Sequence, residues 1–344
     1  MRRSWMTKGC LIVLISIIAA WPIADVGIAA AEHLAPCKDG FPRQPIRLLS
    51  HLAPGSDADA YLRALAEASK PYSPVPLLVE DLVSPKGVWG QLKQISEKKG
   101  GEEGYFVPVI SGGHIVRAIR LDIRPYSMTD VRGVIITHYD PVVFAVKSDA
   151  KWKTLKDLLD EAKASPGSVR IIAGGSAGGG DHSVAVLLET AAKVKFTIIP
   201  SPGSGQATLT LLGGGAEAGS FTLGGPVAYL KSGELRGLAM AMPTKKRDPA
   251  WPNIPSFKEQ GIDIGFPYPW GLVVPKTVPN EHVKWLFELF NKGALTANFK
   301  KFIEAKGYAV TIRTPEVVDQ EIQETYKNLE PVLDALGLKF KPQS

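Results

Sequence analysis

The chain has 344 residues, and 45% of them are hydrophobic, so it is too long for one compact core and rich enough in apolar residues to fold. The formal net charge of +6 comes from dispersed lysines and arginines, which argues against nucleic-acid binding.

The first 31 residues have the composition of an export signal. Arg2 and Arg3 precede an apolar run, and small residues at 29–31 form a cleavage site before Glu32. The apolar run is shorter than the roughly 20 residues that a spanning helix needs, which favours a cleaved signal over an uncleaved anchor. We expect the mature chain to begin near Glu32.

The chain has two cysteines and six histidines. Cys10 lies in the signal, so Cys37 is left without an internal disulfide partner. Leu34-Ala35-Pro36-Cys37 is weakly similar to a lipoprotein cleavage box, which leaves lipidation as an alternative. The histidines are scattered without helical pairs or a cysteine cluster, so their spacing predicts no metal site and no cofactor.

Short β-branched runs alternate with helical patterns along most of the chain, which is typical of an α/β protein with parallel sheets. The expected strands are residues 46–50, 76–80, 105–110, 134–137, 142–146, 169–173, 196–199, 235–242, 271–274 and 308–312. The expected helices are residues 57–68, 87–97, 155–164, 183–192, 205–212, 226–231, 280–293, 299–306 and 314–336. These elements suffice for two sheets.

Two turns, at 137–140 and 267–270, each lead into an extended apolar run. If these runs cross between lobes, lobe 1 is discontinuous and combines residues 38–140 with 268–344. Lobe 2 then runs from 141 to 267. Two crossing strands between two α/β lobes would form a hinge.

A glycine-rich loop lies between an expected strand and an expected helix. Five glycines within residues 174–180 leave backbone N–H groups uncovered, and the following helix points its positive end into the same space. The loop therefore predicts an anion site. Its candidate ligand-binding residues are Ser176, Ala177, Gly178, Gly179, Asp181 and His182.

Two further turns follow expected strands in the same way. Ligands of open α/β sheets bind beyond the carboxyl ends of strands, so we expect the three turns to converge on one cleft. An ordinary capped turn without a ligand remains the alternative for the first of them. The candidate residues are Ala53, Pro54, Gly55, Ser56, Asp57 and Asp59 in the first turn, and Ser111, Gly112 and His114 in the second.

The residues 174–178 also match G-x-S-x-G, the nucleophile elbow of α/β-hydrolases, with Ser176 as the nucleophile. That enzyme needs an acid and then a histidine later in the chain. His282 is the only histidine beyond the helix that follows the motif, and it begins an amphipathic pattern. We therefore predict no catalytic residue and keep a serine hydrolase as the alternative.

Landmarks spaced along nearly the whole mature chain carry a family resemblance. They include Pro45-Ile46-Arg47-Leu48, Ala53-Pro54-Gly55, Trp152-Lys153-Thr154-Leu155, Gly175-Ser176-Ala177-Gly178, Lys231-Ser232-Gly233-Glu234-Leu235, Pro252-Asn253-Ile254-Pro255 and Trp270-Gly271-Leu272-Val273-Val274-Pro275. At these residues the chain resembles the periplasmic solute-binding component of tripartite tricarboxylate transporters, the Bug receptor family.

The resemblance implies a type II periplasmic-binding-protein fold with two α/β lobes. It implies a non-enzymatic periplasmic receptor that holds a small organic carboxylate in the cleft and delivers it to the membrane permease subunits of such a transporter. A sensory receptor for a carboxylate is a further alternative.

The chain departs from the family pattern in two places that concern specificity. The first turn reads Gly55-Ser56-Asp57-Ala58-Asp59 where the family commonly has Gly-Gly-Ser-Thr-Asp, which adds a carboxylate. The acid that some relatives use toward an amino group is replaced by Phe221, beside Thr222. We therefore expect an amine-free mono- or dicarboxylate whose apolar body packs on Phe221 and Trp270.

Overall fold

The computed structural model describes residues 32–50, 52, 54–82, 103–113, 115–116, 130–175, 177–266 and 268–337. The chain divides into Met1–Ala31 and a compact unit of Glu32–Ser344. The expected export signal and the expected helix at 87–97 lie outside the described residues. Within the described ranges, no helix has the length and apolarity required to cross a bilayer.

The first sheet has six strands in the order β11-β4-β10-β3-β1-β2. β1 is parallel to β2 and β3, whereas β10 is antiparallel to β3 and β4, and β11 is antiparallel to β4. The sheet is therefore mixed. Its strands are β1 (Ile46–Ser50), β2 (Leu77–Asp81), β3 (Phe106–Ser111), β4 (Val131–Tyr139), β10 (Pro269–Pro275) and β11 (Val310–Arg313).

The second sheet has five strands in the order β7-β6-β8-β5-β9. β6 is parallel to β7 and β8, and β5 is antiparallel to β8 and β9. The sequence prediction missed β8, which lies in the middle of this sheet. The strands are β5 (Val142–Lys147), β6 (Arg170–Ala173), β7 (Thr197–Pro200), β8 (Ala218–Thr222) and β9 (Leu235–Met240).

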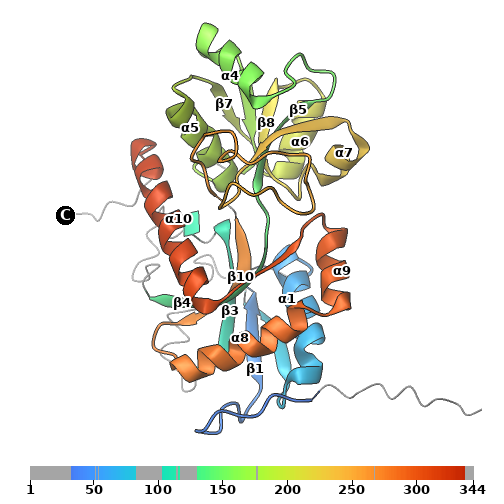
Figure 1. The fold of residues 1–344 in the computed structure, drawn as a ribbon, viewed down its shortest axis with the longest axis vertical. Helices are drawn as coiled ribbons and strands as arrows, with labels where there is room; N and C mark the ends of the chain where they lie inside the picture. Colours follow the sequence, from blue (N-terminus) through green and yellow to red (C-terminus); the bar gives the residue numbers. More distant parts are fainter. Residues whose placement is uncertain are drawn as a thin grey trace, which may run out of the picture. The chain divides into compact units, whose positions relative to one another are not determined.

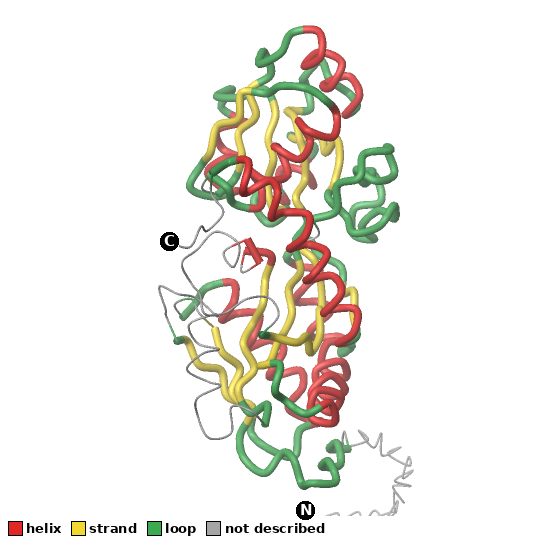
Figure 2. Tube along the Cα trace, turned by 90° about the vertical axis from the view of Figure 1, so that its left-hand side faces the viewer, coloured by secondary structure: helices red, strands yellow, loops and turns green. Residues whose placement is uncertain are grey.

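Helices flank both sheets (Figures 1 and 2). α5 begins at Gly180, three residues before the predicted start, so the end of the glycine-rich loop forms the first helical turn. The helices are α1 (Asp57–Ser69), η1 (Lys70–Tyr72), α4 (Leu155–Ala164), α5 (Gly180–Ala192), α6 (Ser204–Leu212), α7 (Val227–Ser232), α8 (Asn280–Ala294), α9 (Ala297–Ala305) and α10 (Pro315–Ala335).

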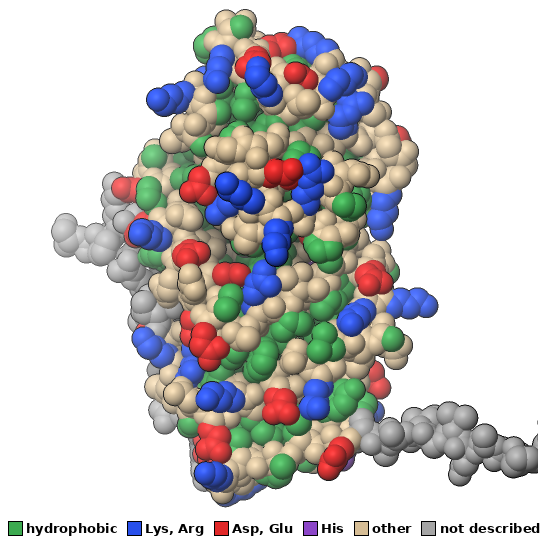
Figure 3. Space-filling view, in the orientation of Figure 1, with side chains coloured by type: hydrophobic (Ala, Val, Ile, Leu, Met, Phe, Trp, Pro, Cys, Tyr) green, Lys and Arg blue, Asp and Glu red, His purple; other side chains and the backbone are tan. Residues whose placement is uncertain are grey.

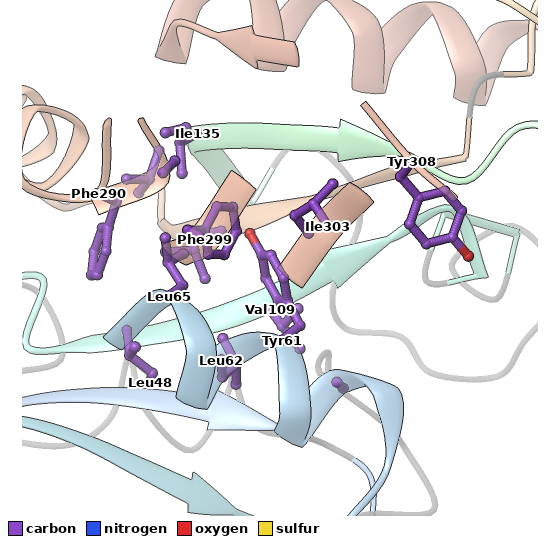
Figure 4. Packing of buried hydrophobic residues seen from close by; sticks show 14 of the residues in the cluster. Leu48, Tyr61, Leu62, Leu65, Val109, Ile135, Phe290, Phe299, Ile303 and Tyr308 are labelled. Carbon is purple, nitrogen blue, oxygen red and sulfur yellow. The ribbon is translucent and has the colours of Figure 1, made fainter. Parts of the chain in front are cut away.

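Apolar side chains of α1, α8 and α9 pack against the first sheet. Leu62 and Leu65 of α1 are fully buried together with Phe290 and Phe299 (Figure 4). A second cluster fills the interior around β5, β6 and α5, and it also contains Leu329 and Leu333 of α10. The last helix, which follows the first sheet in the sequence, therefore contributes to the core of the second.

The chain passes between the sheets twice. It leaves β4 at Tyr139 and enters β5 at Val142, and it returns through the segment that precedes Pro269 of β10. The amide of Asp140 donates to the carbonyl oxygen of Tyr268 at 2.9 Å, so the two connections are hydrogen bonded to each other. The expected residue limits of the lobes stay predictions.

The surface charges are mixed. On the face drawn in Figure 3, basic and acidic side chains alternate without one large patch of either sign. This arrangement agrees with the dispersed charges of the sequence and offers no broad basic surface on that face for a phosphate backbone.

Candidate ligand-binding site

A pocket lies where α1, the end of β4, the start of β10 and the end of α9 meet; the space in it outside protein atoms, open solvent included, is about 330 Å³. Two of the predicted residues, Asp57 and Trp270, line it. The complete lining is Asp57, Tyr61, His138, Asp140, Trp270, Phe302, Ile303, Lys306 and Tyr308.

One wall of the pocket is aromatic. The ring of His138 stacks on Trp270 with centroids 5.9 Å apart, and it lies 5.2 Å from Tyr308 and 5.5 Å from Tyr61. Thr137 Oγ1 lies 3.1 Å from His138 Nδ1 and 3.0 Å from the Tyr61 hydroxyl. Burial lowers the pKa of His138 to about 3, so this ring is neutral at physiological pH.

Asp140 is a buried acid at the junction of β4 and β5, with 9% of its surface exposed. Its Oδ1 accepts a hydrogen bond from the amide of Gly224 at 3.2 Å, and Tyr308 and the amide of Leu223 also donate to the carboxyl. Burial raises the pKa of Asp140 to about 7, and the nearby charge of Asp57 acts in the same direction.

Asp181 lies in the first turn of α5 and is also buried. Its Oδ2 accepts from the Ser204 hydroxyl at 2.7 Å, and that hydroxyl lies 2.7 Å from Thr222 Oγ1. Burial raises the pKa of Asp181 to about 7, with a further contribution from Asp140. Two buried acids from different elements therefore influence each other's ionisation.

The amides of Gly55 and Gly178 are not bare, contrary to the sequence prediction. The Gly55 amide donates to Asp59 Oδ2 at 2.8 Å, and the Gly178 amide donates to His182 Nδ1 at 3.3 Å. In each case the acceptor is four residues further on, in the first turn of the following helix, so the helix supplies its own cap. Ser56 Oγ likewise accepts from the amide of Asp59.

The ring of Tyr268 lies against two of the predicted turns. A Cβ atom at Gly112 would lie 2.6 Å from this ring, and one at Gly180 would lie 2.7 Å from it. Tyr268 has a left-handed backbone with φ of 52°, which is uncommon for a non-glycine residue. The turn after β3 and the start of α5 are therefore neighbours, as expected, but an aromatic side chain fills the space between them.

Phe221 does not line the pocket. Its side chain is fully buried and belongs to a core cluster that contains residues of both sheets. Neighbouring residues of a strand point to opposite faces, so Thr222 is partly exposed near Ser204 while Phe221 points into the core. The expected packing of a ligand on Phe221 is thus replaced by packing inside the protein.

The remaining predicted residues have varied positions. Pro54 and Ala177 are exposed, Gly179 is partly exposed, and Ser111 is buried at the end of β3. Ala53, His114 and Ser176 lie outside the described residues.

The comparisons with known proteins decide the family. The model of the tripartite tricarboxylate transporter family receptor, TctC, matches residues 92–338, which is more than half of the chain. The chain belongs to the TctC receptor family. The resemblance read from the sequence is therefore confirmed.

Two relatives show how far the likeness of this TctC receptor extends. Protein BugT of Bordetella pertussis is 26% identical over 324 residues, which cover 93% of this chain and 96% of BugT. A crystal structure of a TctC solute binding protein from Polaromonas, without ligand, superposes with a TM-score of 0.78 at 26% identity and covers 86% of this chain and 99% of that one. This TctC receptor therefore has the two-lobed type II periplasmic-binding-protein fold.

A less similar solved structure contains a ligand. MatC from Rhodopseudomonas palustris with bound malate has a TM-score of 0.63 at 20% identity, covering 85% of this chain and all of MatC. At this identity the likeness supports the fold alone.

Sequence reasoning missed several pocket residues of the TctC receptor. Asp140 lies in the predicted turn 137–140 between two apolar runs. An acid between two apolar runs could have indicated that this residue belongs to the site. Lys306 and Tyr308 follow α9, and Lys306 Nζ lies 2.8 Å from Asp57 Oδ1, a residue 249 positions earlier. No local pattern connects segments so far apart.

Away from the pocket, the fold brings three residues together that are distant in the sequence. Potential ligand atoms of Cys37, Asp39 and His282 lie within 4.8 Å of one another, although the sequence spacing indicated no such group. His282 Nε2 lies 2.7 Å from Asp39 Oδ2, and its Nδ1 lies 2.8 Å from the carbonyl oxygen of Glu103. These contacts connect Asp39 and Glu103 to His282 of α8.

Proposed function

We propose that this chain is a periplasmic receptor that captures a small organic carboxylate and delivers it to the membrane permease subunits of a tripartite tricarboxylate-type transporter. Residues 1–31 would direct its export and then be removed. Membership of the TctC receptor family supports the general role, and the likeness to a structure with bound malate makes a carboxylate the first ligand to test.

The position of the pocket is the observation that carries the proposal. Asp140 lies on the connection from β4 to β5, and Trp270 is the second residue of β10, directly after the other connection; both line the pocket. A ligand that contacts both segments has different affinities for conformations that differ in the angle between the lobes. Its binding can therefore shift the population toward a closed conformation.

A contact close to the pocket joins segments from the two sheets. Trp251, which follows β9, donates its indole N–H to the carbonyl oxygen of Gly307 at 2.7 Å. Gly307 directly precedes the pocket residue Tyr308. Closure of the pocket and the packing of Trp251 would therefore change together.

Lys306 is the proposed anchor for the ligand carboxylate. Its Nζ lines the pocket at the end of α9 and is bonded to Asp57 in the first turn of α1. A carboxylate placed there would meet the ammonium group and the positive end of α1. Asp57 is largely exposed, so it can turn toward solvent when a ligand takes its place.

The hydrolase alternative finds no support at His282. Both ring nitrogens of this residue are engaged, one with Glu103 and the other with Asp39. A general base must have one nitrogen available to the nucleophile. A sensory role would use the same pocket and differ only in the membrane partner.

Thermal-shift and calorimetric titration with a panel of carboxylates test the proposal. A ligand at 100 times its dissociation constant should add about 2.7 kcal/mol to the free energy of unfolding. Lys306→Met should weaken the best ligand at least tenfold, a loss of about 1.4 kcal/mol. Lys301→Met, in α9 just before Lys306 but exposed and outside the pocket, should leave affinity unchanged.

Ser176→Ala separates the receptor from the hydrolase. A receptor loses at most part of its affinity, whereas a hydrolase loses turnover of ester substrates by orders of magnitude. Failure of every carboxylate to stabilise the chain would reject the proposed receptor.

A further inference from the structure

The pocket combines aromatic ring faces with a buried carboxyl group. Asp140 lies beside Trp270 and Tyr308 in the lining. We propose that this juxtaposition recognises a positively charged ammonium group, so that the ligand is an ammonium-bearing carboxylate rather than a di- or tricarboxylate. The carboxylate half of this inference rests on the proposed function.

The aromatic wall suits a cation. Ring faces of Trp, Tyr and Phe attract ammonium groups placed within about 6 Å of the ring centroid. Tyr61 contacts Trp270 edge-on with centroids 5.7 Å apart, and His138 stacks on Trp270 and makes a tilted contact with Tyr308. The wall therefore presents several rings to one small volume, and Trp270 is its partly exposed member.

The charge balance of the pocket points the same way. The cation in its lining, Lys306, is already bonded to Asp57. Across the described ranges, neither Asp140 nor Asp181 forms an ion pair with a lysine or arginine, and their hydrogen-bond donors are amides and hydroxyls. A buried carboxylate without a counter-charge is unfavourable, and a ligand ammonium group would supply that charge.

The same residues disfavour a second ligand carboxylate. The amides of Gly55 and Gly178, which could have held it, are occupied by Asp59 and His182. A second negative group would instead approach Asp140, where like charges repel. The sequence favoured an amine-free ligand because position 221 lacks an acid; the fold provides acids at 140 and 181.

Two matched ligand pairs test the inference on the full wild-type chain by calorimetric titration at pH 8. Trimethylammonioacetate is compared with tert-butylacetate, and trimethylammoniobutanoate with tert-butylbutanoate. The members of each pair share their shape and their carboxylate and differ in the charge of the head group. In at least one pair the ammonium compound should bind tenfold or more tightly.

Asp140→Asn locates the origin of this preference. In this variant, the ammonium compound and its uncharged isostere should bind with nearly equal affinities. The affinity for the isostere should stay as in wild type. Asp149→Asn, an exposed acid outside the pocket, should keep the wild-type ratio. Because the ratio is first measured on the wild type, the inference stays testable if Asp140→Asn folds poorly.

The outcomes separate the inference from the proposed function. Equal or tighter binding of the isosteres, or tighter binding of glutarate than of either ammonium compound, overturns the ammonium site and leaves the carboxylate receptor standing. Binding of choline as tightly as the ammonium carboxylates would support the cation site and reject the carboxylate receptor. Lack of binding by all these compounds overturns the inference.

Discussion

The ring of Tyr268 lies directly against Gly180, so close that a Cβ atom on the glycine would stand 2.7 Å from the ring carbon Cε2. Gly180 is the first residue of α5, and Tyr268 belongs to the connection that leads into β10. The absence of a side chain at Gly180 therefore lets a connection between the sheets pack on the start of a helix.

Gly180→Ala should destabilise the receptor because the added methyl group would overlap the rings of Tyr268 and Phe266. Overpacking of this kind costs about 1–3 kcal/mol, which chemical denaturation can measure. Gly205→Ala, in α6 with no atom within 4 Å of its Cβ position, is the matched control and should be neutral or slightly stabilising. Equal stability of Gly180→Ala and wild type would contradict the close packing.

His182→Ala should expose the amide of Gly178 and then let a small anion replace the lost acceptor. Loss of the partner of a buried N–H costs about 1–3 kcal/mol, and helix N-termini bind carboxylates. Acetate should therefore raise the melting temperature of His182→Ala more than that of wild type. His33→Ala, at an exposed position, should respond to acetate as wild type does.

Asp140 and Asp181 should make the stability of the ligand-free receptor depend on pH. Their pKa values are about 7 in the folded chain against 3.8 as the ordinary value, so the folded state holds these protons more tightly. The contribution of these protonated acids to the free energy of unfolding is therefore complete below about pH 4 and is lost as the pH rises to about 7. Between pH 4 and pH 8 the free energy of unfolding of Asp140→Asn should fall less than that of wild type, by an amount of order 1–4 kcal/mol. A pH profile parallel to that of wild type would refute it.

The affinity for an ammonium ligand should rise over the upper part of the same range. Protons compete with the ammonium group for Asp140, whose pKa is raised by burial and by the charge of Asp57. Tyr308 donates to this carboxyl group, and Lys306 lines the same pocket. With a pKa of about 7, ionisation increases about tenfold between pH 6 and pH 8. Titration of trimethylammoniobutanoate at both pH values measures this, and a flat or falling affinity would contradict it.

The thiol of Cys37 should react slowly with iodoacetamide at pH 8. Burial raises its pKa above the ordinary value of 9.0, and the charges of Glu281 and Asp39 raise it further, so little thiolate is present. Alkylation mapped by peptide mass spectrometry should be slower than that of N-acetylcysteine. Glu281→Gln should accelerate it, and an unchanged rate in this variant would exclude the electrostatic contribution of Glu281.

Local patterns predicted much of the fold. The strand at 46–50 and the helix at 155–164 were predicted with the bounds that the structure has. In the helix, Thr154 and Asp157 form a capping box, so the start is set by neighbouring residues. β8, with the sequence Ala-Gly-Ser-Phe-Thr, was missed because it has few β-formers; it is a strand because β5 and β6 pair with it on both sides.

The site was harder to predict than the fold. Glycines marked the three turns, and the structure does place two of them against Tyr268. The chemistry of the pocket comes from Asp140, Lys306 and Tyr308, which only tertiary packing brings to α1. The capping of Gly55 by Asp59 was present in the spacing, since a carboxylate in the first helical turn can accept from the preceding loop.

The hydrogen bond from the Asp140 amide to the Tyr268 carbonyl has an evolutionary consequence. Asp140, whose side chain lines the proposed ligand pocket, uses its own main chain to join the two connections between the sheets. If the acid at this position selects the ligand, its replacement also alters the contact between the connections, and lineages that exchange it should carry compensating changes around residue 268.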